Sequence, residues 1–420
     1  MDRWTNPTIA VIGLGYVGLP LAVALSRDFD VLGFDIDTAR IQELNGGHDR
    51  TNELTPDALT SSSAQLTGDL GALQGRDIFI VTVPTPVSEK NEPDLTAVKK
   101  AAETVGKAIG KGGIAVFEST VYPGVTEDIC GPAIEAASGL KAGTDFFLGY
   151  SPERINPGDK VHTVDKITKV VAGQTPEVAA VLARVYGAMN GDRIHIAPDI
   201  KTAEASKVIE NAQRDINIAF VNEIALIFER MGLSVYDVLD AARTKWNFLD
   251  FKPGLVGGHC IGVDPYYLSH AAQQMGYDPD VILSGRRIND AMGSVLAERI
   301  HKSLGIEGAK ILVLGITFKE NVPDIRNSKV IDVIRGLEAF GHSVSVYDPL
   351  ADIAETKHEY GVDLIGEPSG PYHAVLGAVP HAAFNDMPIA ELLEPDGLVA
   401  DIKGIWRGVD LGAGLRRWSL

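Results

Sequence analysis

The chain has 420 residues, of which 45% are hydrophobic and 22% are charged, so it is long and apolar enough for two or three globular domains. Its formal net charge of −18 excludes a general nucleic-acid binder with a basic face, and the lack of a run of about 18 apolar residues excludes a membrane-spanning helix. The two cysteines, Cys130 and Cys260, are too few for a disulfide framework and indicate a reducing compartment, so we expect a cytoplasmic protein.

The N-terminal part of the chain, 1–198, alternates short apolar runs with helical stretches, which is the βαβ rhythm of a doubly wound parallel sheet. The first 25 residues lack the basic region of a signal peptide, and their glycine spacing predicts a strand, a turn and a helix instead. The continuous apolar runs indicate strands that are covered on both faces. We predict strands at 8–13, 31–35, 78–84, 114–120, 146–152 and 168–173.

A central region, 199–300, begins with a long predicted helix from 199 to 231, where apolar residues recur at helical spacing without proline or glycine. Asp199 can cap the start of this helix, and Gly232 suits its end. A helix of this span is about 50 Å long, which suits either a link between domains or a dimer face.

The βαβ rhythm returns in the C-terminal part, 301–420. The predicted fold class is therefore α/β, with two doubly wound Rossmann-like domains joined by a long central helix. The similarity of the two ends is a repeat at the level of the fold, not a solenoid repeat. We predict a loop at 367–373 and strands at 310–318, 342–349, 372–379 and 398–404.

A glycine-rich turn, GLGYVG, follows the first predicted strand and opens a helix. The first glycine allows the tight turn, the second lets a pyrophosphate approach the backbone, and the third lets helix and strand pack closely. Asp35 ends the next strand, where a carboxylate binds ribose hydroxyls and favours NAD over NADP, although Arg40 nearby could accept a 2′-phosphate. A doubly wound domain without a nucleotide is the alternative. The candidate phosphate loop comprises Gly13, Gly15, Tyr16, Val17 and Gly18.

Further polar stretches follow predicted strands, at the edge where doubly wound sheets bind their ligands. VPTP and ESTVYPG place Thr85 and Thr120 to line a cofactor cleft, unless these are ordinary turns. Glu153 in SPERINPG is a candidate general base, unless it is a solvated surface residue. In GITFKENVPDIRNSK, Lys319 and Arg326 are placed to reach phosphates of a ligand.

Polar residues also mark one face of the long helix. Lys207 and Asn211 are four residues apart and therefore share a face, and Glu204 lies one turn before Lys207. These residues either belong to a site or form a solvated polar stripe.

Cys260 lies in GLVGGHCIGVDPYYL, among glycines and polar residues rather than apolar neighbours. It either fills a small gap or is a nucleophile, and a nearby Lys207 would lower the pKa of the thiol and activate it. His259 positions the loop, binds substrate or caps a turn, and the sequence does not separate these roles. Cys130 lies in a predicted helix, and we interpret it as structural.

Taken together, and in this order along the chain, these motifs resemble the nucleotide-sugar dehydrogenases, the family that includes UDP-glucose 6-dehydrogenase. The resemblance implies an N-terminal NAD domain, a central helix that dimerises and a C-terminal UDP-sugar-binding domain, with no metal. It implies a four-electron oxidation of the sugar C6 hydroxyl to a carboxylate with two NAD. Cys260 would form a thiohemiacetal and then a thioester, Glu153 would activate the hydrolytic water, and Lys207 would stabilise negative charge on the C6 oxygen.

The resemblance also assigns the other candidate residues. Asn211 would assist Lys207, and Asp264 with Thr120 would hold a water or transfer protons. The residues at NAD-contacting positions are Asp35, Arg40, Thr85, Thr120 and Arg326. The candidate substrate-binding residues are Glu153, Arg154, Lys207, Asn211, Gly257, His259 and Lys319.

Departures from the UDP-glucose branch narrow the expected substrate. Pro157 and Val263 stand where that branch has a glutamate and a lysine, and Arg154 and Asn156 differ as well. The motifs look more like the branch that oxidises UDP-N-acetylhexosamines for bacterial capsules and O-antigens. We expect UDP-N-acetylglucosamine, with the galacto and manno epimers as alternatives. A two-electron dehydrogenase that needs no cysteine and a non-catalytic nucleotide-sugar sensor are the rival functions.

Overall fold

The computed structural model describes residues 4–88, 90–154, 163–258, 261–412 and 414–420. The chain forms two compact units, each with its own sheet and hydrophobic core. One unit comprises Met1–Glu210 with Tyr266–Tyr277, and the other comprises Asn211–Pro265 with Asp278–Leu420. Among the described residues, no helix is both long and apolar enough to cross a lipid bilayer.

The sheet of the first unit has the strand order β3-β2-β1-β4-β5-β6-β7-β8 in the described part of the chain. The predicted strands are confirmed, but the predicted all-parallel sheet is wrong at one place, because β6 and β7 pair antiparallel. We did not predict β3 and β8, because both are short and partly exposed and so leave no continuous apolar run. The strands are β1 (Ile9–Ile12), β2 (Val31–Phe34), β3 (Gln65–Thr67), β4 (Ile78–Val81), β5 (Ile114–Phe117), β6 (Phe147–Tyr150), β7 (Lys169–Gly173) and β8 (Ile194–Ile196).

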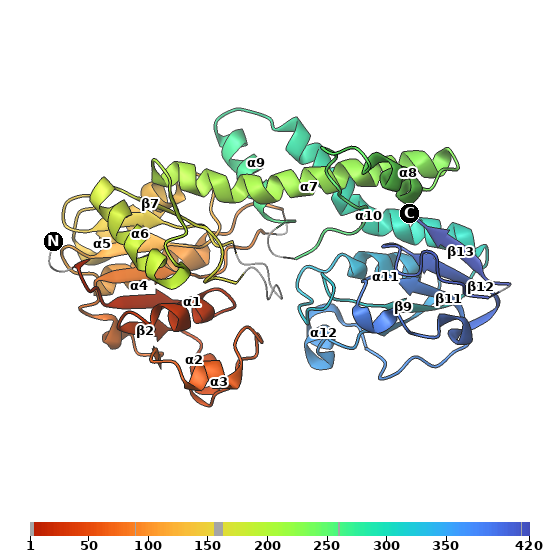
Figure 1. Ribbon diagram of the computed structural model, residues 1–420, viewed down its shortest axis with the longest axis horizontal. Helices are drawn as coiled ribbons and strands as arrows, with labels where there is room; N and C mark the ends of the chain where they lie inside the picture. Colours follow the sequence, from red (N-terminus) through yellow and green to blue (C-terminus); the bar gives the residue numbers. More distant parts are fainter. Residues whose placement is uncertain (1–3, 89, 155–162, 259–260, 413) are drawn as a thin grey trace. The chain divides into compact units, whose positions relative to one another are not determined.

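Helices connect these strands (Figure 1). Local signals set their ends: the Thr175 hydroxyl caps α6, Pro176 occupies its first turn, and Gly191 ends it with a φ of +66°. Cys130 ends a π-helical turn, Thr126–Cys130, and is buried, which raises the pKa of its thiol and agrees with a structural role. The helices are α1 (Gly18–Leu25), α2 (Thr38–Asn45), α3 (Pro56–Thr60), α4 (Thr96–Ala108), α5 (Gly131–Ser138) and α6 (Pro176–Asn190).

The predicted long helix is confirmed as α7 (Ile200–Arg230), which is continuous in Figure 1. The Asp199 side chain accepts a hydrogen bond from the Thr202 N–H at 2.7 Å, and Gly232 follows the helix with a φ of +70°. Three further helices follow, α8 (Val235–Ala242), α9 (Asp264–Gln274) and α10 (Asp280–Leu304).

The sheet of the second unit is parallel, with the order β10-β9-β11-β12-β13 in the described residues. Its predicted strands are confirmed, whereas β13 was not predicted, because its sequence RRWS is charged and partly exposed. The order reverses beside β9, as it does beside β1 in the first unit, and such switch points are where open α/β sheets bind ligands. The elements are β9 (Lys310–Leu314), β10 (Ser343–Tyr347), β11 (Tyr372–Gly377), β12 (Leu393–Asp401), β13 (Arg416–Ser419), α11 (Val330–Ala339) and α12 (Ile353–Tyr360).

Candidate active site

The glycine-rich turn between β1 and α1 has the backbone that a bound pyrophosphate requires. Gly13 has a φ of +96°, which disfavours any other residue. A Cβ on Gly18 would lie 1.9 Å from the Gly13 carbonyl oxygen, so only glycine fits there. A Cβ on Gly15 would meet no atom within 4 Å, which leaves the backbone open to a ligand. Tyr16 and Val17 are half-buried and lead into α1.

Asp35 follows β2 and holds this turn. One carboxylate oxygen accepts the Leu14 N–H at 2.7 Å, and the other accepts the Asp37 N–H at 2.9 Å. A carboxylate oxygen has two lone pairs, so both oxygens keep acceptor capacity for ribose hydroxyls. The turn and its carboxylate therefore fit the adenosine half of a dinucleotide.

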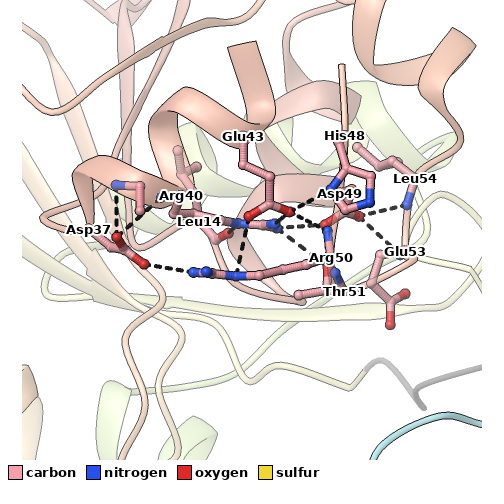
Figure 2. Close-up of polar contacts among 11 residues, drawn as sticks. Leu14, Asp37, Arg40, Glu43, His48, Asp49, Arg50, Thr51, Glu53 and Leu54 are labelled. Atoms are coloured by element: carbon pink, nitrogen blue, oxygen red, sulfur yellow. Dashed lines mark hydrogen bonds and ion pairs between the residues drawn. The ribbon is translucent and has the colours of Figure 1, made fainter. Parts of the chain in front are cut away.

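Arg40 faces inward, and this bears on the choice between NAD and NADP. Its side chain is buried and donates to the Leu14 carbonyl oxygen, to Glu43 and to Asp49 (Figure 2). Its guanidinium is thus surrounded by carboxylates, which would repel a 2′-phosphate. The NADP alternative that Arg40 left open in the sequence is not supported by this arrangement. The hydrogen bond to Leu14 shows that Arg40 helps to hold the turn, and its contact with NAD stays a prediction.

β4 pairs with β1, and β5 pairs with β4, so the loops after these two strands follow neighbouring strands on the far side of the switch point. They are joined by a hydrogen bond from the Ser119 hydroxyl to the Val83 carbonyl oxygen at 2.6 Å. Thr85 and Thr120 follow these two positions and are half-buried. The structure thus brings both threonines to the predicted edge of the sheet, on connected loops.

Glu153 follows β6, and its side chain is buried. This burial contradicts the alternative of a solvated surface glutamate. The next residue, Arg154, is turned to α7, where its guanidinium pairs with Glu210 at 2.8 Å, and it also donates to the Thr168 carbonyl oxygen at 3.1 Å. The Arg154 guanidinium would therefore bind a substrate only while it is also paired with Glu210.

Lys207 and Asn211 lie on one face of α7 and are 4% and 8% exposed, so the alternative of a solvated polar stripe is wrong. The Asn211 side-chain amide donates to the Asp264 carboxylate at 2.5 Å. Asp264 is fully buried and is the first residue of α9. A buried ammonium group, an amide and a carboxylate are thus placed by α7 and α9.

Glu204, one turn before Lys207, has a role that the sequence did not reveal. Its buried carboxylate accepts the N–H groups of Gly124 at 2.5 Å and Thr126 at 2.9 Å. Burial raises the pKa of Glu204 to about 7, although these hydrogen bonds oppose the rise. Glu204 therefore fastens the loop that carries Thr120 to α7.

The stretch before Cys260 is fixed in the second unit by buried polar contacts. The Asn222 side chain on α7 accepts the Gly254 N–H at 2.7 Å and donates to the Gly254 carbonyl oxygen at 3.0 Å. A Cβ on Gly257 would lie 2.6 Å from the Asn327 carbonyl oxygen, so this glycine lets the stretch pack against the loop that carries Lys319. His259 and Cys260 themselves lie outside the described residues.

The loop after β9 is the counterpart of the glycine-rich turn, as predicted. Gly315 has a φ of +91°, and Asp348, which follows β10, accepts the Ile316 N–H at 2.7 Å, just as Asp35 accepts that of Leu14. Here, however, the buried His381 ring also lies 3.1 Å from the same Asp348 oxygen. The Nδ1 of His381 accepts the Asn321 N–H, so Nε2 carries the proton and donates to Asp348.

Four backbone N–H groups and the His381 ring thus donate hydrogen bonds to the Asp348 carboxylate. Burial alone would raise the pKa of this carboxyl, but hydrogen bonds from His381 and Ile316 outweigh it and lower the pKa. Arg326, on the same loop, forms a two-pronged ion pair with Asp324, and the carbonyl oxygen of Lys319 accepts the Thr317 hydroxyl. The structure places Lys319 and Arg326 on one loop at the switch point of the second sheet.

Three models of one protein family match successive parts of the chain. They are the NAD binding, central and UDP binding domains of the UDP-glucose/GDP-mannose dehydrogenase family, at residues 7–190, 201–291 and 312–408. The matches together span most of the chain and follow its order of folding elements.

Individual proteins are similar over nearly the whole length. Protein CapL of Staphylococcus aureus is 51% identical over 99% of this chain and 100% of its own. The UDP-N-acetyl-D-glucosamine 6-dehydrogenase of Pseudomonas aeruginosa is 51% identical over 90% of this chain and 92% of its own. Among solved structures, a UDP-D-ManNAc dehydrogenase from Pyrococcus horikoshii matches 98% of both chains with a TM-score of 0.87 and 29% identity.

Proposed function

Because this chain belongs to the UDP-glucose/GDP-mannose dehydrogenase family, we propose that it oxidises the C6 hydroxyl of UDP-N-acetylglucosamine to a carboxylate with NAD as the oxidant. The observation that carries this proposal is the buried set of Lys207, Asn211 and Asp264 on α7 and α9. Buried ionisable groups with specific partners cluster at sites of chemistry, which supports the proposal. The substrate epimer is supported by 51% identity to a dehydrogenase named for UDP-N-acetylglucosamine, against 33% to one named for the manno epimer.

The proposed chemistry has two oxidations and a hydrolysis. NAD supplies the hydride acceptor for each oxidation. The Cys260 thiolate adds to the carbon of the C6 aldehyde and forms a thiohemiacetal, which the second oxidation converts to a thioester. The Lys207 ammonium group donates to the C6 oxygen and stabilises its negative charge. Glu153 accepts a proton from the water that hydrolyses the thioester.

The stoichiometry of NADH tests this proposal directly. We expect about two NADH for each UDP-N-acetylglucosamine consumed by purified protein in excess NAD, because two hydrides leave C6. Absorbance at the NADH band and chromatography of the sugar nucleotide give the ratio. A ratio of one would mean that the reaction ends at the aldehyde, as in the two-electron alternative. A lack of NADH with all three epimers would favour the sensor.

Asp35 gives a second test, at the cofactor site. Asp35→Ala removes the acceptor for the Leu14 N–H and for the ribose hydroxyls, so we expect KM for NAD to rise by about 10-fold or more. KM for the UDP-sugar should change much less. Initial rates with each substrate varied in turn measure both constants. An unchanged KM for NAD would remove Asp35 from the ribose site.

We further propose that the protein works as a homodimer in the cytoplasm and serves synthesis of bacterial surface polysaccharide. Phe220 and Ile227, two turns apart on α7, are 57% and 45% exposed, and Trp246 is 91% exposed. Exposed apolar side chains on one helix are typical of an interface, and we propose that a second copy of the chain covers Phe220 and Ile227. A sedimentation mass of one 44.9 kDa chain would contradict the dimer.

A further inference from the structure

A buried cluster of titratable side chains lies behind the loops that follow β5 and β6, and the proposed chemistry does not use it directly. Glu118 follows β5, Lys169 begins β7 and Tyr186 lies on α6, and each is at most 3% exposed. The Lys169 ammonium group and the Tyr186 hydroxyl donate to the two carboxylate oxygens of Glu118. The Lys169 nitrogen also lies 5.2 Å from the centroid of the Tyr186 ring.

Stability alone is a poor reason for this cluster. Removing two charges from water costs free energy that a buried ion pair often fails to recover, and apolar residues of similar volume serve a core as well or better. We therefore look for the reason for this buried ion pair in its position in the sheet.

The cluster extends the contact between β6 and β7 beyond the residues that are paired through their backbones. The pairing of β6 with β7 joins Gly149 to Gly173 and Tyr150 to Ala172. Beyond these paired residues, side-chain hydrogen bonds connect the two segments. The Ser151 hydroxyl donates to the carbonyl oxygen of the β7 residue Val170 at 2.7 Å, and the Lys169 ammonium group donates to the Pro152 carbonyl oxygen at 3.3 Å.

Pro152 has no N–H with which to extend the pairing, so its position depends on contacts of its other atoms. It directly precedes Glu153, which is buried. Lys169 is therefore tied on one side to the Glu118 loop after β5 and on the other to the peptide that carries Glu153.

We propose that Lys169 is a positioning residue, which fixes the peptide between Pro152 and Glu153 so that the Glu153 carboxylate meets the hydrolytic water. This inference rests on the proposed function. In the hydrolysis, a bond forms from the water oxygen to the acyl carbon and the carbon–sulfur bond breaks. Glu153 takes a proton from the water, and sulfur leaves as the thiolate. Loss of the Lys169 anchor therefore slows hydrolysis and spares the two oxidations that precede it.

The test is a paired substitution, Glu118→Gln with Lys169→Met, which removes both charges and leaves no buried carboxylate without a partner. We expect the steady-state kcat to fall by about 10- to 100-fold, because small displacements of a reacting group have effects of this size. The first-turnover burst of NADH should keep its rate, and kcat/KM should stay within about 3-fold, so KM should fall together with kcat, because the steps before hydrolysis are unchanged. Intact-protein mass after acid quenching should show the acyl adduct on a larger fraction of the protein.

Three further variants define what the cluster does. Tyr186→Phe removes a donor to Glu118 but keeps the contact between Lys169 and Pro152, so no adduct should accumulate. Lys169→Arg keeps a charged donor and should retain most of the hydrolysis rate. Ser151→Ala removes the hydrogen bond to the Val170 carbonyl oxygen without changing the cluster, and it should slow hydrolysis less than the paired substitution does. This variant keeps the inference testable if the paired variant does not fold.

The outcomes separate this inference from its premise. Equal slowing of the burst and of the steady state, without adduct, would show that the cluster only supports the fold. Adduct in Glu153→Gln but not in the paired variant or Ser151→Ala would overturn the role of Lys169 alone. No adduct in any variant, with one NADH per sugar in the unaltered protein, would overturn the proposed function and the inference with it.

Discussion

Replacing Cys260 with serine is expected to lower the rate of carboxylate formation by at least about 1,000-fold, the scale seen when a covalent nucleophile is lost. A serine hydroxyl stays protonated at neutral pH and adds poorly to an aldehyde, so the covalent intermediate on which the second oxidation depends does not form. Anion-exchange chromatography of the UDP-sugar acid measures the loss, and NADH measured in parallel shows whether the first oxidation persists.

The matched control is the other cysteine. Cys130→Ala alters a buried thiol whose pKa burial raises, and we expect it to keep its turnover with some loss of thermal stability. Normal acid output from Cys260→Ser would contradict the assignment of the nucleophile and would favour the two-electron dehydrogenase.

Lys207→Met is expected to lower kcat by about 100- to 1,000-fold, which corresponds to the 2.7–4 kcal/mol typical of a donor to a developing oxyanion. Lys207 is only 4% exposed, so water screens its charge little, and methionine keeps its approximate length and apolar stem. KM for the UDP-sugar should change much less than kcat, because the interaction strengthens in the transition state. Steady-state kinetics at saturating NAD separate the two constants.

A second lysine on the same helix provides the control. Lys201 lies on α7, its side chain is 52% exposed, and it forms an ion pair with Asp128 at 3.1 Å. Exposed pairs of this kind contribute up to about 1 kcal/mol to stability, so Lys201→Met should leave kcat within about 2-fold. If both variants lost the same activity, the effect would come from the helix as a whole and the oxyanion role of Lys207 would be wrong.

Most of the fold was predictable because the buried strands are continuous apolar runs. β1, β2, β4 and β5 are buried at every residue, and this pattern is legible in the sequence without knowledge of neighbours. β13 was missed because an exposed edge strand needs no apolar run. The antiparallel pairing of β7 depends on the path of the chain between strands, which a local pattern does not encode.

Residues of the candidate site were predictable where a local sequence motif identifies them. They were not predictable where their role depends on a partner that is distant in the sequence. The spacing of Lys207 and Asn211 showed a shared face, but only the packing showed that this face is buried. Glu204 holds Gly124, which is 80 residues away in sequence, so no motif joins them. The hydrogen bonds of Arg40 to Asp49 and Leu14 were not predictable, because Asp49 lies in a stretch with no recognised pattern.

The histidine on Asp348 distinguishes the loop after β9 from the glycine-rich turn of the first sheet. His381 occupies the carboxylate that would receive a second adenosine ribose, so the described residues offer the dinucleotide geometry once, at Asp35. The proposed reaction consumes two equivalents of oxidant at that one position. The spent cofactor must therefore leave and a fresh one arrive while the half-oxidised sugar waits on the protein. The fraction of aldehyde that is released therefore depends on the lifetime of the covalently bound sugar as well as on the rate of each oxidation.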